Sequence, residues 1–229
     1  MSQKAASTAQ ECVVVANQNL RVAKIGARHG YFFVKRVFDL VFSLLGLIFC
    51  LPIWLVVAIA IKAEDGGPVF YKSTRIGKGG KEFTMYKFRS MHVNADEELE
   101  KITAKNPKLA KEYKKNKKLH DDPRITKTGK KIRHASIDET PQIFNILRGE
   151  MSIVGNRPYL PREKKDMQDY FDVIVREKPG LTGAWQTSGR NDIGFEERLK
   201  IEYDYSNHQN TMTDLKIIFK TAKSILRGK

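Results

Sequence analysis

Cysteine is scarce in this chain: Cys12 and Cys50 are the only two, they lie far apart, and Cys50 falls within an apolar stretch. This scarcity argues against a disulfide framework and a cysteine zinc site, and it indicates a reducing compartment that faces the cytosol. The five histidines show no spacing typical of metal ligands. His134 lies near an acidic pair in the sequence, but a solvent-facing or hydrogen-bonded histidine is the favoured interpretation.

Acidic residues are outnumbered, with 26 Asp and Glu against 41 Lys and Arg and a formal net charge of +15. A chain this basic calls for an acidic partner, which is nucleic acid, an anionic membrane surface or a phosphorylated substrate. A recognisable nucleic-acid-binding module is missing, and such a function would leave a long apolar stretch without a purpose. We therefore expect no nucleic acid among the partners.

That apolar stretch runs from Leu40 to Ile61 without a charge, which is long enough for a membrane segment. It starts too late for a secretory signal, and no small-residue cleavage pattern follows it. Pro52 divides it into pieces of about 18 Å and about 14 Å, each shorter than the roughly 30 Å hydrocarbon core. Basic residues flank both ends, so we expect a re-entrant helix-break-helix hairpin at Pro52. A kinked single span and a buried core helix are the alternatives.

Two short alternating segments on either side of Gly77–Gly80 predict a β-hairpin. The glycines lack Walker spacing, so a plain turn is favoured over a phosphate cradle. In the second segment Lys87 and Arg89 fall on one face, either as an exposed basic edge or as substrate contacts. Residues 94–120 form a lysine-rich helical stretch, which is either a solvated face or a surface that rests on anionic headgroups.

Asp138 and Glu139 form an acidic pair at the start of a predicted helix. Ser136 has the character of an N-cap, so Glu139 closes a capping box in the simplest interpretation, and Gly149 ends the helix. Asp138 has no capping task, and the helix dipole favours its ionised form, which a nucleophile or a magnesium ligand must have. The two side chains project about 100° apart, so they cannot share one task symmetrically.

Arginines bracket this acidic pair, and guanidinium groups commonly bind phosphoryl oxygens. A phosphoryl-transfer site and a plain capping box therefore remain alternative interpretations of the local sequence. The arginines concerned are Arg133, Arg148 and Arg157.

Several ordered motifs resemble the bacterial sugar transferase family, the monotopic polyprenyl-phosphate phosphoglycosyl transferases. The resemblance covers roughly residues 31 to 229. One departure is visible, because the family usually has Gly-Pro-Arg-Pro where this chain has Asn156 as the second residue. Arg157 is kept, whereas the rigidity of that loop is put in doubt. The motifs are Asp122–Thr126, Ser136–Gln142 and Leu147–Pro158, with Tyr86–Met91 upstream and Lys178–Arg190 downstream.

The resemblance implies a membrane helix broken at Pro52, a nucleophilic Asp138 and the cofactor Mg²⁺, held by Glu139 with Asp138. It also implies a UDP-sugar donor and a polyprenyl phosphate acceptor, in contact with membrane lipids. Asp138 would attack the phosphorus that bears the sugar and release UMP, and the lipid phosphate would then attack the covalent intermediate. Substrate contacts are expected from Lys87, Arg89, Arg133, Gln142, Arg157, Pro158, Gln186 and Arg190.

We therefore expect an α+β fold, a mostly helical membrane-associated catalytic domain with a small β-hairpin and a re-entrant membrane hairpin. The expected division is a mobile N-terminal segment over 1–30, the re-entrant helix over 31–63 and a cytosolic catalytic domain over 64–229. The domain would end in an amphipathic helix, which lies on the membrane or packs on the domain.

The resemblance places the catalytic domain on the cytoplasmic face of the bacterial inner membrane, at the first membrane step of a surface glycan pathway. A galactose or glucose donor is preferred to an N-acetylated sugar, and a homodimer is left open. A non-catalytic membrane-anchored scaffold is the alternative function. It would explain the apolar stretch and the lysines but not the acidic pair among arginines.

Overall fold

The computed structural model describes residues 2–116, 119–188 and 193–226, with side chains described over 28–114, 119–188 and 193–224. The chain divides into two compact units, Met1–Phe38 and Asp39–Lys229. Helix α1 (Ser2–Asp65) contributes residues to both units. The expected boundaries at residues 30 and 63 remain predictions.

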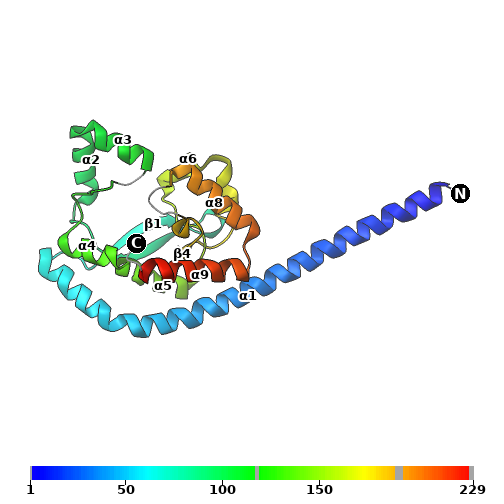
Figure 1. Cartoon of the computed structure of the whole chain (residues 1–229), viewed down its shortest axis with the longest axis horizontal. Coiled ribbons are helices and arrows are strands. Elements are labelled where there is room, and N and C mark those ends of the chain that lie inside the picture. The colour runs from blue at the N-terminus through cyan, green and yellow to red at the C-terminus, as the bar shows by residue number, and fades with distance from the viewer. Residues whose placement is uncertain (1, 117–118, 189–192, 227–229) are drawn as a thin grey trace. The chain divides into compact units, whose positions relative to one another are not determined.

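Helix α1 carries the apolar stretch and continues through Pro52. In Figure 1 the cyan part of α1 is one curved ribbon and not two helices. The expected break at Pro52 is therefore not confirmed: proline removes a single amide donor, and an apolar helix can stay helical on both sides of it. By length and composition, Arg28–Asp65 is long and apolar enough to cross a membrane.

Within the second unit, α1 buries one face and exposes another. Trp54, Val57 and Ile61 are buried, whereas Phe49 is 75% exposed and Leu55 is 65% exposed. The buried residues share a core cluster with Phe88, Ile132 and Ile143 from later elements. Burial of each such side chain contributes about 1.5–3 kcal/mol, so this face of α1 is part of the domain core. The exposed apolar face calls for lipid or a partner surface.

Polar contacts fasten both ends of this part of α1. Near its start, Asp39 Oδ1 accepts hydrogen bonds from Ser152 Oγ at 3.0 Å and from the Ile153 amide at 2.9 Å. At its end, the Glu64 carboxylate accepts from the amides of Lys127 at 2.8 Å and Thr128 at 3.1 Å. The Glu64 contact satisfies free amide donors at the start of a later helix, α4 (Lys127–His134).

The predicted β-hairpin is confirmed. Strands β1 (Phe70–Ile76) and β2 (Glu82–Phe88) pair antiparallel, with Phe70 opposite Phe88. The turn contains a short 3-10 helix, η1 (Lys78–Gly80), and Gly79 and Gly80 have φ values of 66° and 78°. Only glycine adopts this left-handed backbone without strain, so the glycines serve the turn.

The lysine-rich stretch is helical, as expected, but it forms two helices, α2 (Ala95–Lys105) and α3 (Pro107–Asn116). The acidic pair lies on a 3-10 helix, η2 (Ile137–Gln142), which leads into α5 (Ile143–Arg148). Gly149 ends α5 with φ 82°, as its sequence position predicts.

The rest of the domain is built around a short parallel strand pair that the sequence did not reveal. Strands β3 (Ser152–Val154) and β4 (Gly180–Thr182) pair in parallel. The two small sheets among helices agree with the α+β class. The other elements are η3 (Pro161–Glu163), α6 (Lys164–Met167), η4 (Gln168–Tyr170), α7 (Phe171–Ile174), η5 (Trp185–Thr187), α8 (Phe195–His208) and α9 (Thr211–Leu226).

The last described helix, α9, packs on the domain and keeps an apolar face outside. Ile217 is buried with Val154 and Tyr205, whereas Phe219 is 73% exposed. The expected helix is therefore present. Ile217 is its buried apolar residue, and Ile218 packs partly buried against the same cluster.

Candidate active site

The acidic pair lies beside the β-hairpin, because η2 packs along β2. Ser136 has a left-handed backbone, with φ 56°, and its side chain makes no capping hydrogen bond. The expected capping box is therefore wrong. Glu139 instead contacts the strand, where its Oε1 lies 2.5 Å from the Nζ of Lys87. Two residues that lie 52 positions apart in the sequence thus form an ion pair.

Asp138 is buried, with 7% of its surface exposed. Burial, and after it the Glu139 charge, raise the pKa of its carboxyl from 3.8 to about 6. The positive charges of Lys87 and Arg133 act in the opposite direction. The sequence predicted that a helix dipole would favour the ionised form, but the burial of the side chain is the larger effect here.

The structure therefore brings four of the expected site residues together. β2 supplies Lys87, α4 supplies Arg133, and η2 supplies Asp138 and Glu139. Arg133 is exposed, so its guanidinium is accessible to an anion from solution. An aspartate held among two cations and a second carboxylate is suited to chemistry on a phosphate ester.

Arg89 is placed differently from Lys87. It follows the last residue of β2 and is buried, and it forms a paired contact with Asp65, in which Nη1 lies 2.6 Å from Oδ2. Its Nε also donates to the Pro68 carbonyl at 2.7 Å. The Arg89 guanidinium thus binds the end of α1 and the residues that follow it. Gln142 ends η2 and is buried as well.

Arg148, one of the arginines that bracket the pair, contacts Tyr86. Its Nη1 donates to the tyrosine hydroxyl at 2.9 Å, and its guanidinium lies 5.2 Å from the ring centroid. This contact is on the surface. It leaves Arg133 as the bracketing arginine whose charge acts on Asp138.

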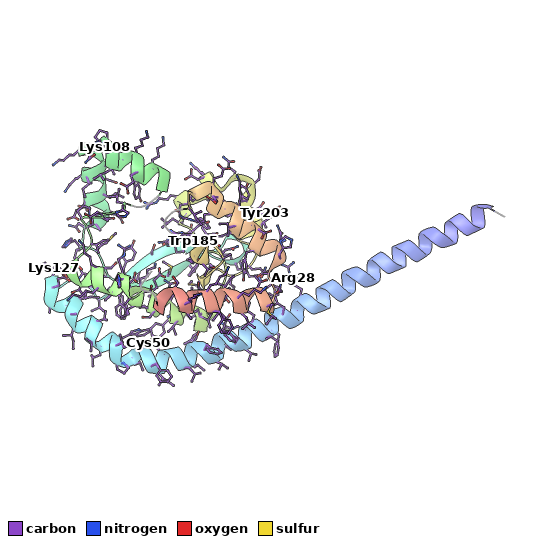
Figure 2. The ribbon with its side chains drawn as sticks, viewed as in Figure 1. Arg28, Cys50, Lys108, Lys127, Trp185 and Tyr203 are labelled. Carbon is purple, nitrogen blue, oxygen red and sulfur yellow. The ribbon has the colours of Figure 1, made fainter. Side chains whose placement is uncertain are left out.

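Arg157 belongs to a second cationic cluster. Its amide donates to Glu202 Oε1 at 2.9 Å, and its guanidinium lies 5.9 Å from the Trp185 ring centroid. Arg198 lies 4.2 Å from the same ring, and Arg75 donates to the Pro158 carbonyl at 3.2 Å. Figure 2 shows Trp185 in the interior of the domain, where it is buried.

Burial and the closeness of several arginines shift the pKa values in this cluster. Burial and the nearby Arg157 charge lower the pKa of Arg75 to about 10, and the same two causes lower the pKa of Arg198. Burial raises the pKa of Glu202 to about 7. Sequence reasoning missed Arg198 and Glu202. Their i, i+4 spacing, which places two side chains on the same face of a helix, was the available signal.

Gln186 and Arg190 are the last two of the expected substrate contacts. Gln186 lies next to Trp185 on η5. Arg190 lies outside the described residues.

Asn156 stands where the family usually has proline, and its side chain holds the loop in another way. Its Nδ2 donates to the Ile174 carbonyl at 2.9 Å and to Ser206 Oγ at 2.6 Å. These hydrogen bonds tie the Arg157 loop to α7 and α8. They supply restraint that a proline ring would otherwise give.

The carboxylates near Asp138 are the available oxygen ligands for magnesium. In the part of the chain with described side chains, no three His, Cys, Asp or Glu side chains gather as a metal site. Asp138 and Glu139 are two neighbouring carboxylates that repel each other. Mg²⁺ is often bound by one or two carboxylates together with substrate phosphates, so this pair fits such a site.

Comparison with known proteins gives a match to the family model described as "Bacterial sugar transferase" over residues 30–228. The chain is 42% identical over 208 residues to the undecaprenyl-phosphate galactose phosphotransferase of Salmonella typhimurium, which covers 91% of this chain and 44% of that protein. It is 41% identical over 191 residues to the exopolysaccharide production protein ExoY of Sinorhizobium fredii, covering 83% of this chain and 84% of ExoY.

A further similarity is to a protein of Aeromonas hydrophila named UDP-N-acetylgalactosamine-undecaprenyl-phosphate N-acetylgalactosaminephosphotransferase. The two chains are 35% identical over 210 residues, which is 86% of this chain and 45% of that protein. The chain therefore spans less than half of the Salmonella and Aeromonas proteins and most of ExoY.

Proposed function

We propose, because this chain belongs to the bacterial sugar transferase family, that it transfers a sugar 1-phosphate from a UDP-sugar to a polyprenyl phosphate. The observation that carries the proposal is the buried Asp138 carboxyl between the cations of Lys87 and Arg133. The printed names of the Salmonella and Aeromonas relatives support undecaprenyl phosphate as the acceptor.

The proposed mechanism has two displacements at one phosphorus. An Asp138 carboxylate oxygen attacks the phosphorus that bears the sugar, the bond to the UMP oxygen breaks, and UMP leaves. A phosphate oxygen of the lipid then attacks the same phosphorus, and the bond to Asp138 breaks to restore the carboxylate. Lys87 and Arg133 stabilise negative charge that develops on the phosphoryl oxygens.

Glu139 would hold Mg²⁺ beside Asp138, and the Lys87 contact fixes the direction of the Glu139 side chain. The metal would offset negative charge on the donor diphosphate. Arg157, with Asn156 restraining its loop, is our candidate for a second anion contact. Gln186 and Pro158 would lie near the sugar or nucleotide.

We place the exposed apolar face of α1 in the bilayer and the catalytic domain on the cytoplasmic face of the inner membrane. Basic residues precede and follow the apolar stretch, which favours cytoplasmic positions for both flanks. Both substrates would then meet at the interface, because the lipid phosphate headgroup stays there. With both flanks in the cytoplasm, the segment would enter and leave the bilayer on the same side. Labelling of cysteines introduced on either side of the segment tests this: opposite accessibilities would show a span and rule out the re-entrant arrangement.

The donor and products test the proposal directly. Purified protein with undecaprenyl phosphate, Mg²⁺ and single UDP-sugars should release UMP, and we expect UDP-galactose or UDP-glucose to be preferred over N-acetylated donors. Donor alone should label the protein covalently without continuous release of UMP. Release of UDP would instead indicate direct sugar transfer and would contradict the mechanism, and absence of turnover with every donor would favour a scaffold.

The raised pKa of Asp138 predicts a pH-dependent cost in stability. Between its ordinary value of 3.8 and about 6, the folded carboxyl keeps a proton that the unfolded chain has lost. Stability from this group therefore falls as pH rises through that range, by about 3 kcal/mol in total. Asp138→Asn should match the wild-type Tm at pH 4 and exceed it at pH 7, measured in detergent with EDTA.

Glu202 also titrates in this range, but it is present in both proteins, so its effect cancels in the comparison. A wild-type protein that gains stability relative to Asp138→Asn as pH rises would contradict the prediction.

A further inference from the structure

A partly buried hydrogen bond joins helix α1 to the turn that carries the acidic pair, η2. Trp54 Nε1 donates to Thr140 Oγ1 at 2.7 Å, and Thr140 Oγ1 donates to the Ile137 carbonyl at 2.8 Å. A hydroxyl has one proton and two lone pairs, so both bonds can form together. Because Ile137 precedes Asp138 and Thr140 follows Glu139, these bonds hold both ends of the turn.

The Trp54 side chain is itself held firmly. It is 7% exposed, and its ring lies 5.9 Å from Phe88 and 5.4 Å from Phe144, centroid to centroid. Phe88 neighbours Lys87 on β2, so one indole packs against the strand that carries Lys87 and bonds to the turn that carries Asp138. The indole thereby links the two elements that form the Lys87–Glu139 ion pair.

Packing alone does not require a tryptophan at this position. A phenylalanine would fill much of the same apolar space, but it lacks the N–H that Thr140 accepts. The Trp54 side chain is buried, so an indole N–H left without this partner is unfavourable, and the hydrogen bond has a fixed direction. The N–H therefore restricts the turn to one position relative to α1.

We propose that Trp54 is a positioning residue for Asp138 and Glu139, so that the apolar helix orients the acidic pair in addition to holding the protein at the membrane. The inference rests on the proposed phosphosugar transfer. A displacement near 1 Å at a reacting group can reduce rate by up to about a hundredfold. Loss of this bond should therefore affect the chemical step more than donor binding.

Two substitutions remove the bond from opposite sides. Trp54→Phe and Thr140→Val should each lower kcat by about tenfold, with the donor KM within about twofold of wild type. Thr140→Ser keeps the hydroxyl and should restore most of kcat. The double variant should be no slower than the slower single variant, because both changes remove the same interaction.

A matched control is available in α2, where Thr103 Oγ1 donates to the Leu99 carbonyl at 2.8 Å far along the chain from the pair. Thr103→Val removes the same kind of hydroxyl bond and should leave kcat unchanged. Activities are compared per folded protein, with Tm measured for every variant.

The inference is overturned if Trp54→Phe and Thr140→Val keep kcat within twofold, or if Thr140→Ser is as slow as Thr140→Val. It is also overturned if activity falls only in proportion to the folded fraction. Failure of the proposed function looks different: the wild-type protein then gives no UMP from any donor, and both proposals fall. An active wild type with unaffected variants removes only the assignment of Trp54.

Discussion

Asp138→Asn should abolish turnover, lowering kcat by at least about a thousandfold and removing covalent labelling by the donor. The amide has nearly the shape of the carboxylate but cannot attack phosphorus. The surrounding cations, Lys87 and Arg133, remain in place, so donor binding should largely survive. UMP release and labelling with radioactive UDP-sugar, with and without lipid acceptor, measure the two losses separately.

Misfolding would not explain that loss, because Asp138 is held at a cost to the fold. Its carboxyl is buried beside Glu139, and both features raise its pKa. The neutral amide relieves that cost at pH 7, so the inactive variant should be at least as stable as wild type. Groups that lower stability in their own fold are commonly functional.

A matched control is Asp169→Asn. Asp169 is also an aspartate in a 3-10 helix, but it is exposed to solvent on η4. Its kcat should equal that of wild type. Retention of turnover or covalent labelling in Asp138→Asn would contradict the nucleophilic role, because another group would then have to attack the phosphorus.

The acidic pair could be found from the sequence because the motif that contains it is continuous in the chain. The side chains that contact the pair in the fold could not be found in this way. Lys87 and Glu139 are separated by 52 residues in the chain, and pattern analysis gives no register between a strand and a distant turn. The capping box was wrong because Ser136 takes a left-handed backbone, which residue identity did not reveal. Local motifs thus located the candidate pair, and tertiary packing decided its contacts.

Length explains which strands could be predicted. β1 and β2 have seven residues each, enough for a two-residue alternation, and a glycine turn joins them. β3 and β4 have three residues each, which is too short for any period, and they pair in parallel across a long connection. Glycines at 155, 180 and 183 were the remaining signal, since they allow backbones to approach closely.

Pro52 shows the limit of a local rule in an apolar helix. The rule that proline ends a helix holds where water or a turn can form hydrogen bonds with the backbone groups that the proline leaves without a partner. Here the helix on both sides is held by the domain core, through Trp54 and Val57 on one side of the proline and Gly46 on the other. Gly46 packs closely against the domain, since a Cβ there would lie 3.3 Å from Ile143 Cδ1.

Gly180→Ala should have the second large effect, a failure to fold or a fall in Tm of about 10 °C or more. A Cβ at this position would lie 2.1 Å from the Gly155 amide nitrogen and 2.4 Å from the Thr182 carbonyl oxygen. Both atoms belong to backbone, so no side chain can move aside. The strands would have to separate. Thermal unfolding in detergent and resistance to limited proteolysis measure the outcome.

Separation of β3 and β4 would also remove the support of the Arg157 loop, because the Gly180 amide donates to the Asn156 carbonyl at 2.8 Å and the Gly155 amide donates to the Thr182 carbonyl at 2.9 Å. Any folded fraction should therefore lose activity as well. Gly30→Ala is the control, since a Cβ there meets nothing within 4 Å and alanine favours a helix. A Gly180→Ala protein with wild-type Tm would mean that this close approach of backbones is not what fixes the Arg157 loop.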